Sequence, residues 1–481
     1  MEPSAQPEIV YRQEVARLQA LLGVQKKKQS NLGWLRLAII IITAVAAFQL
    51  FSFSVAAGII AIVVGIAIFL AIVSIDVNNN NAISNTQKLL GIVEDELKVL
   101  QNNFHHLYDG AAFAPDVHDY SNDLDIFGKA SLYQYTNRCH SQQGRALLAQ
   151  NFLQPLPVNE IGERQKAVTE LAPLYGWRQQ LQALSMQNAV TQRTERQAQL
   201  WLQEEGEHFT EKRWQWIVPI YSIFTITSAV AAALDYIPTA LFSLLFIIYL
   251  VVSSSLSKRA MQAYAHLAGI VKEVDTLQQL MQWIERQKFK SPLLANLQQS
   301  VKVEDKDASV QIKSLKSILG RFDLRLNVLV FIFLNSFLLW DVRQMMALNK
   351  WRAKNKDKVL LWFHLIAEVE VLSSLAALRF NQPQWSFPSF TSQHFTFNAT
   401  ELGHPLIPAE HRVTSSFDVE GIAKVALVTG SNMAGKSTFL RSLGVSVVMA
   451  QMGAPVCAQL LELSPVQLMS SMRIADNLAE N

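Results

Sequence analysis

The most restrictive feature of this 481-residue chain is a stretch at residues 37–75 that contains no charged side chain. One helix over this stretch would be about 58 Å long at about 1.5 Å per residue, whereas the hydrocarbon core of a bilayer is only about 30 Å thick. Two helices that fold back on each other fit this thickness, with a turn near residues 51–54. A secretory signal fits less well, because its apolar core has only about 7 to 15 residues. Residues 37–75 are therefore predicted to form a transmembrane hairpin.

A second apolar stretch, residues 214–257, contains one charged residue, Asp235. Asp235 and the helix breaker Pro238 interrupt the stretch halfway, which predicts a second hairpin over residues 215–257. The expected fold is thus an α-helical membrane protein with four transmembrane helices in two hairpins.

Basic residues flank both hairpins and are absent from both turns. Lysine and arginine mark the cytoplasmic ends of membrane spans. The flanking residues are Arg17, Lys26, Lys27, Lys28, Arg36, Lys212, Arg213, Lys258 and Arg259. We therefore expect an integral protein of the plasma or inner membrane, with its N-terminus, middle segment and C-terminal part in the cytoplasm.

A third apolar stretch, residues 326–340, has two interpretations. As a helix it would reach only about 22 Å, too short to cross the hydrocarbon core. An odd number of spans would also place the later part of the chain outside the cell. A buried helix of a soluble core is therefore favoured over a membrane-embedded segment.

The overall composition excludes some classes of protein. Only 17% of the residues are charged, against about a quarter in soluble domains, so a single soluble globule and a disordered chain are both excluded. The net charge of +3 is too small to indicate a nucleic-acid binder by charge alone. Two cysteines, Cys139 and Cys457, lie far apart in sequence and are expected to be reduced thiols.

Two polar clusters have competing interpretations. The first could supply metal ligands, but its spacing is not that of a zinc site, so a solvated linker is favoured; it comprises His105, His106, Asp109, Asp116, His118, Asp119, Asp123 and Asp125. The second fits a solvated face best, ahead of contacts with lipid headgroups or with DNA phosphates; it comprises Lys350, Arg352, Lys354, Lys356 and Lys358.

The strongest chemical signal follows a β-rich run at residues 425–429. Residues 430–437 match the phosphate-loop pattern G-x-x-x-x-G-K-[ST], and residues 437–451 have helical character. In this pattern backbone N–H groups and a helix N-terminus bind phosphate, the lysine bridges the β- and γ-phosphates, and the serine hydroxyl binds Mg²⁺. The predicted ATP site consists of Gly430, Ser431, Asn432, Met433, Ala434, Gly435, Lys436, Ser437 and Thr438, with Lys436 and Ser437 in the catalytic roles and Ser437 as the Mg²⁺ ligand.

The residues around this loop resemble the MutS family of DNA mismatch-repair ATPases. Thr429–Thr438 is similar to the family loop T-G-P-N-M-G-G-K-S-T, with Ser431 and Ala434 as departures. Three further segments resemble family elements: residues 124–138, residues 367–376 and residues 403–407. Residues 473–478 resemble a shortened R-I-G-A-x-D-D-L segment. The resemblance covers about residues 123–481.

The resemblance implies a division of the chain. Residues 123–214 and 258–385 would form a MutS-like helical core, and residues 386–481 a partial C-terminal α/β P-loop ATPase domain. Residues 1–36 would be a cytoplasmic N-terminal segment and residues 76–122 a cytoplasmic linker helix. The first hairpin would stand in the place of the family's N-terminal mismatch-reading domain. His404, Arg412 and Val413 would lie near the nucleotide, although His404 equally fits a turn beside Pro405.

The resemblance also implies a function. It predicts an ATPase whose ATP-driven closure of a homodimer acts on DNA, with Asn432 sensing the γ-phosphate. The acidic Walker B strand of the family has no counterpart after Lys436, so the chain is expected to be a truncated product and its hydrolysis is left open. Two alternatives remain: a non-catalytic membrane scaffold, and an ATPase motor of a membrane process unrelated to DNA.

Overall fold

The computed structural model describes residues 7–203, 209–268, 271–393, 395–430 and 435–472. Helix α1 (Pro7–Phe51) and helix α2 (Val55–Leu100) form a long antiparallel hairpin, with its turn at residues 52–54. The two helices approach closely at Gly65, where a Cβ atom would lie 2.3 Å from the Thr43 side chain. Large apolar side chains of residues 37–75 point outward along both helices and at the turn, among them Ile42 of α1 and Phe53 of the turn, which are 65% and 85% exposed.

The second hairpin consists of α8 (Trp214–Ala233) and α9 (Thr239–Ala268), and the break between them contains Asp235 in a left-handed conformation (φ 56°). Beside it lies α13 (Val328–Leu338), which is followed by α14 (Trp340–Asn355) after a bend of 76°. The prediction of a buried soluble helix at residues 326–340 is wrong, because Val328 and Leu329 are 64% and 73% exposed. This segment packs on α9 through Asn335 and Phe337, whereas the side chains of Val328 and Leu329 are left uncovered.

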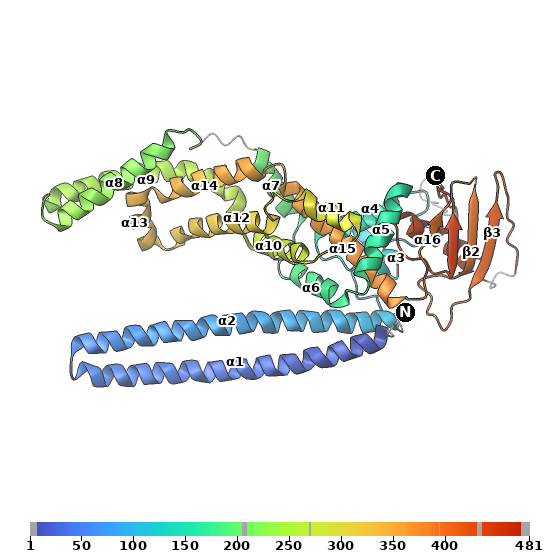
Figure 1. Cartoon of the computed structure of the whole chain (residues 1–481), viewed down its shortest axis with the longest axis horizontal. Coiled ribbons are helices and arrows are strands. Elements are labelled where there is room, and N and C mark those ends of the chain that lie inside the picture. The colour runs from blue at the N-terminus through green and yellow to red at the C-terminus, as the bar shows by residue number, and fades with distance from the viewer. Residues whose placement is uncertain (1–6, 204–208, 269–270, 394, 431–434, 473–481) are drawn as a thin grey trace, which may run out of the picture.

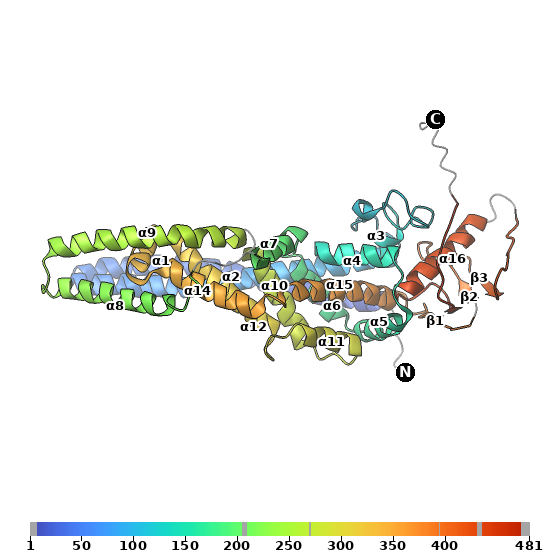
Figure 2. The ribbon, with the colours of Figure 1, turned by 90° about the horizontal axis from the view of Figure 1, so that it is seen from above.

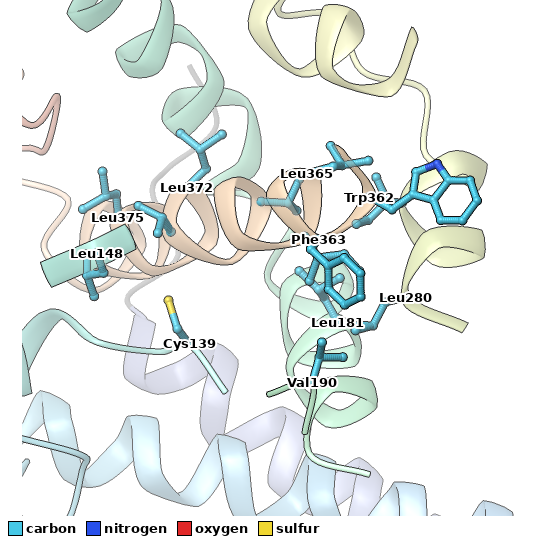
Figure 3. Packing of buried hydrophobic residues seen from close by; sticks show 14 of the residues in the cluster. Cys139, Leu148, Leu181, Val190, Leu280, Trp362, Phe363, Leu365, Leu372 and Leu375 are labelled. Atoms are coloured by element: carbon cyan, nitrogen blue, oxygen red, sulfur yellow. The ribbon is translucent and has the colours of Figure 1, made fainter. Parts of the chain in front are cut away.

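The helical body is built around α15 (Val359–Asn381), most of whose residues are buried. Figure 3 shows the apolar side chains of α15 and its neighbours, including Leu148, Leu181 and Leu280. The other elements of the body are η1 (Ala111–Phe113), α3 (Leu132–Thr136), α4 (Gln142–Leu153), α5 (Val158–Leu171), α6 (Tyr175–Ser185), α7 (Gln192–Gln203), α10 (Val271–Arg286), α11 (Pro292–Ser300), α12 (Ala308–Phe322) and η2 (Asp323–Leu326).

The C-terminal part is a small mixed sheet with one helix. Its strands are β1 (Ser389–Phe390), β2 (Thr396–Leu402), β3 (Ser415–Glu420) and β4 (Leu460–Leu463), in the order β1-β4-β2-β3. Strands β1 and β4 are parallel, and β2 is antiparallel to both β3 and β4. Helix α16 (Lys436–Gln451) buries most of its second half against the rest of the chain.

The whole molecule is elongated, and its two ends differ in structure. Figures 1 and 2 show both hairpins extending in the same direction from the helical body, with the sheet and α16 at the opposite end. By length and composition, five of the described helices could cross a membrane, or six if α13 and α14 count as one broken span. Four of the five form the hairpins, and the fifth is α15, whose apolar side chains are buried in the body.

Candidate nucleotide-binding site

The described part of the predicted phosphate loop lies at the start of α16. Gly435 caps this helix in a left-handed conformation (φ 76°) that favours glycine, and Lys436 and Ser437 begin its first turn. The Lys436 ammonium group donates a hydrogen bond of 2.5 Å to the carbonyl oxygen of Gly430. Ser437 and Thr438 are exposed and Lys436 is partly exposed, so a phosphate group has access to them. Ser431, Asn432, Met433 and Ala434 fall outside the described residues.

The segment that precedes the loop differs from the prediction. Residues 424–430 form no strand, and Val425 and Leu427 are 93% and 85% exposed. The prediction of a buried strand at residues 425–429 is therefore wrong for this structure. β-rich composition is not enough, because a strand needs a neighbour for its backbone hydrogen bonds, and the four described strands pair only with one another.

Helix α16 is anchored to the first residues of the helical body. The Arg441 guanidinium donates to the carbonyl oxygen of Asp123 (3.1 Å) and lies 3.5 Å from the Asp125 carboxylate. Leu124 packs on Gly444, where an added Cβ atom would lie 2.8 Å from the leucine side chain. Both segments were singled out in the sequence, one as a family element and the other as the helix after the loop. Their spacing in the sequence did not indicate that they are in contact.

The residues expected near the base of a nucleotide have other contacts. Arg412 donates two hydrogen bonds to the carbonyl oxygen of Ile407 and stacks over the Trp385 ring, whereas Val413 is 86% exposed. Burial, together with the positive charges of Arg441 and Arg412, lowers the pKa of His404 to about 4. His404 is therefore neutral at physiological pH and accepts a hydrogen bond from the Leu406 N–H group, as a turn residue does.

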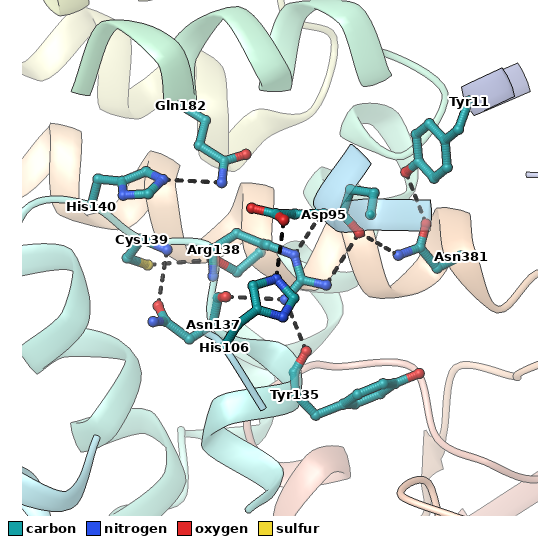
Figure 4. A network of polar contacts seen from close by, with 12 residues as sticks. Tyr11, Asp95, His106, Tyr135, Asn137, Arg138, Cys139, His140, Gln182 and Asn381 are labelled. Carbon is teal, nitrogen blue, oxygen red and sulfur yellow. Dashed lines mark hydrogen bonds and ion pairs between the residues drawn. The ribbon is translucent and has the colours of Figure 1, made fainter. Parts of the chain in front are cut away.

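A buried polar network joins the first hairpin to the body next to this domain (Figure 4). Tyr11 of α1 donates to Asn381 at the end of α15 (2.8 Å), and Asn381 donates to Glu96 of α2 (2.7 Å). The Glu96 carboxylate also pairs with Arg138 (2.5 Å). Burial alone would raise the pKa of Glu96, but the Arg138 charge and the hydrogen bonds from Arg138 and Asn381 outweigh it and lower the pKa. Both helices of the hairpin thus bind the end of α15.

The same hairpin also touches the sheet domain. The Asn102 amide, just after α2, donates to the carbonyl oxygen of Leu406 (3.2 Å), which lies in the loop after β2. A movement of the sheet domain against the body would therefore disturb contacts of the first hairpin. Sequence analysis missed this link, because it pairs residues that are about 300 or more positions apart.

The two polar clusters from the sequence also have contacts within the chain. In the first, His106 lies 3.2 Å from Asp95, and no three His, Cys, Asp or Glu residues of the described ranges form a potential metal site. In the second, Arg352 stacks on Trp201, Lys354 pairs with Glu304 at 2.5 Å, and Lys358 donates to the Ser300 carbonyl. These three basic residues are thus engaged with the body itself.

Comparison with known proteins points to one family. Residues 426–481 match the family MutS domain V. The chain is 32% identical over 126 residues to the DNA mismatch repair protein MutS of Ehrlichia chaffeensis, which is 26% of this chain and 15% of that protein. It is 39% identical over 102 residues to MutS of Leuconostoc citreum (20% of this chain, 12% of that protein). It is 41% identical over 76 residues to the DNA mismatch repair protein MSH6 of Arabidopsis thaliana (14% and 6%).

These alignments are restricted in extent: they span about a sixth or less of the length of these relatives. The family match contains the predicted phosphate loop and α16. Through this C-terminal part the chain is related to the MutS family.

Proposed function

We propose that this chain is a membrane-anchored, ATP-binding protein of MutS type. Gly430 to Thr438 would hold the phosphates of ATP, with Lys436 on the β- and γ-phosphates and the Ser437 hydroxyl on Mg²⁺. ATP binding would draw two such domains together as a homodimer, and this closure would move the helical body. ATP hydrolysis is part of the proposal by family relationship alone.

One observation carries the anchoring. The uncovered apolar surfaces of α1, α2, α8, α9 and α13 gather at one end of the molecule, and the start of α16 lies toward the other (Figure 1). A soluble protein rarely exposes contiguous apolar patches larger than a few hundred Å². A bilayer would cover the surfaces of both hairpins at once, and the loop would then face the cytoplasm. The protein would be an integral protein of the plasma or inner membrane.

The geometry at Lys436 supports the ATP site. Its ammonium group already binds a carbonyl oxygen of the loop, which fixes it at the N-terminus of a long helix where an anion is stabilised. A phosphate oxygen in that position would meet both the lysine charge and the backbone N–H groups of α16.

ATP binding is testable with the full chain in detergent and a fluorescent ATP analogue. Replacement of Lys436 by alanine removes a charged hydrogen bond worth about 1.5 to 3 kcal/mol, so affinity should fall by about 10- to 100-fold. Lys313→Ala on α12 is the matched control, because this exposed lysine lies far from the loop in the chain. Unchanged affinity in Lys436→Ala would remove the site assignment and favour a non-catalytic scaffold.

DNA is the proposed partner, because the named relatives are DNA mismatch repair proteins. Binding of duplex DNA by the detergent-solubilised chain should weaken steeply as salt is raised, since phosphate contacts release counterions. ATP should change this affinity in the wild type and not in Lys436→Ala. ATP binding without any DNA binding at low salt would instead favour a motor for a membrane process unrelated to DNA.

A further inference from the structure

A groove of about 420 Å³ lies at the base of the second hairpin. Three helices meet there: the start of α8 contributes Trp214 and Val218, the end of α12 contributes Arg321, and the first half of α14 contributes Trp340, Arg343 and Gln344. Among the described residues, none that lines the groove is acidic. It therefore has a positive and partly aromatic wall, formed by parts of the chain that are distant in sequence.

The two arginines of the groove are held in different ways. Arg343 is half-buried, and its Nε and Nη2 atoms donate to the Leu338 carbonyl and the Ser222 hydroxyl, each at 2.8 Å. Arg321 is exposed, and its carbonyl oxygen accepts a hydrogen bond of 2.9 Å from the Trp340 indole. This bond fixes the Trp340 ring beside Arg321. The neighbouring carboxylate, Asp341, lies 3.9 Å from Arg325 and is not part of the groove wall.

A third polar group lacks a partner. Gln344 lines the groove and is only 4% exposed, yet its Oε1 atom has no hydrogen-bond partner among the described residues. A buried amide oxygen without a donor is costly. The groove thus offers cationic donors for an anion and, next to them, one acceptor that needs a hydroxyl or ammonium donor.

The position of the groove specifies the source of such a ligand. It lies where the exposed apolar side chains of α8 begin, at Trp216, Ile217 and Ile220, and directly after Lys212 and Arg213. Tryptophans at the ends of apolar helices are typical of the lipid headgroup level of a membrane. This step rests on the proposed membrane anchoring.

We propose that the groove binds the headgroup of an anionic phospholipid that carries a hydroxyl group, such as a phosphoglycerol lipid. Its phosphate lies between Arg321 and Arg343, and its hydroxyl group donates to Gln344 Oε1. Trp214 and Trp340 flank the glycerol backbone. A bound lipid of this kind would tie the corner between α13 and α14 to the second hairpin.

The test uses the full chain, first reconstituted into vesicles and then extracted with its bound lipids for native mass spectrometry. From mixed vesicles of phosphatidylcholine and phosphatidylglycerol, the wild type should retain phosphatidylglycerol preferentially. Arg321→Gln and Gln344→Leu should each reduce this retention by about tenfold, as expected for loss of one strong hydrogen bond. Arg193→Gln, at an exposed site on α7, should retain the lipid as the wild type does.

The outcomes separate the two proposals. A chain that does not enter vesicles at all contradicts the membrane anchoring itself. A chain that enters vesicles but retains both lipids equally, or whose Arg321→Gln and Gln344→Leu variants retain phosphatidylglycerol unchanged, overturns the headgroup site alone. Displacement of the lipid by millimolar inorganic phosphate would also overturn it, because the groove would then be a site for free anions.

Discussion

At the scale of single residues, the contact between Gly144 and Glu370 shows how tightly α4 and α15 are joined. The Glu370 carboxylate is buried and accepts hydrogen bonds from the backbone N–H and the hydroxyl group of Ser141, which caps α4. Burial raises the pKa of Glu370, although the hydrogen bonds from Ser141 act against it. A Cβ atom on Gly144 would lie 2.3 Å from Glu370 Oε2, so no larger residue fits.

We expect Gly144→Ala to lower the free energy of unfolding by about 1 to 3 kcal/mol, because the added methyl group overpacks this contact. Gly162→Ala is the control: this glycine is exposed within α5 and nothing lies within 4 Å of its added Cβ atom. Gly162→Ala should be neutral or stabilising by up to about 1 kcal/mol. Thermal unfolding in detergent measures both, and equal melting temperatures would refute the packing argument.

The ion pair of Glu96 with Arg138 predicts a pH dependence. The pKa of Glu96 is lower in the folded than in the unfolded chain, where it is about 4.3, so its contribution is fully present above about pH 5 and is lost as the pH falls through the folded value. Breaking a buried pair costs about 3 to 5 kcal/mol.

Glu96→Gln should therefore destabilise the contact of the first hairpin with α15 at pH 7 and flatten the acid limb of the stability curve. Limited proteolysis between residues 101 and 131, measured from pH 7 down to pH 4, reports this contact, since helix α2 ends at Leu100. Arg12→Gln, at an exposed site on α1, is the control. A variant with the same pH profile as the wild type would argue against the role of the ion pair.

At the scale of elements, sequence reasoning succeeded where one signal decides the structure. A charge-free run longer than a bilayer is thick predicted the turn at residues 51–54, and Pro238 with Asp235 predicted the break between α8 and α9. Helix α16 follows from the helical character of the residues after the loop motif. The strand at residues 425–429 was predicted wrongly, because strand formation depends on a partner that local composition does not specify.

The error at α13 has a related cause. Its short length and the number of membrane spans favoured a buried soluble helix. In the structure Asn335 donates to Ser257 of α9 at 2.9 Å, so this side of α13 faces the second hairpin. Val328 and Leu329 are left uncovered. Which face of a short helix is buried depends on its neighbours, and these became known only from the structure.

Helix α13 therefore gives a prediction of its own. A spin label at Leu329 should have the high oxygen and low nickel accessibility of a lipid-exposed site when the full chain is in vesicles. The same label at Lys313, an exposed position of α12, should have the reverse pattern of a site in water. Aqueous accessibility at both positions would contradict the insertion of α13.

At the scale of the whole molecule, the two hairpins and helix α16 lie at opposite ends of one long axis. Both hairpins extend from the body in one direction, and α16 lies at the other end (Figures 1 and 2). The buried contacts of Tyr11 and Glu96 with Asn381 connect the two ends, and they join residues up to 370 positions apart. Composition and motifs predicted both ends of the molecule, but this connection requires the three-dimensional structure.

The most direct test of the proposed membrane topology is thiol labelling of intact cells with a membrane-impermeant maleimide. The two native cysteines are buried, and burial raises the pKa of Cys457 to about 11, so background labelling should be low. Cysteines at Phe53 and Tyr236, both in hairpin turns and 85% and 80% exposed, should react in intact cells. A cysteine at Glu410 in the sheet domain should react only after permeabilisation. Labelling of the Glu410 position in intact cells, or of only one of the two turns, would contradict a topology with two membrane hairpins and a cytoplasmic sheet domain.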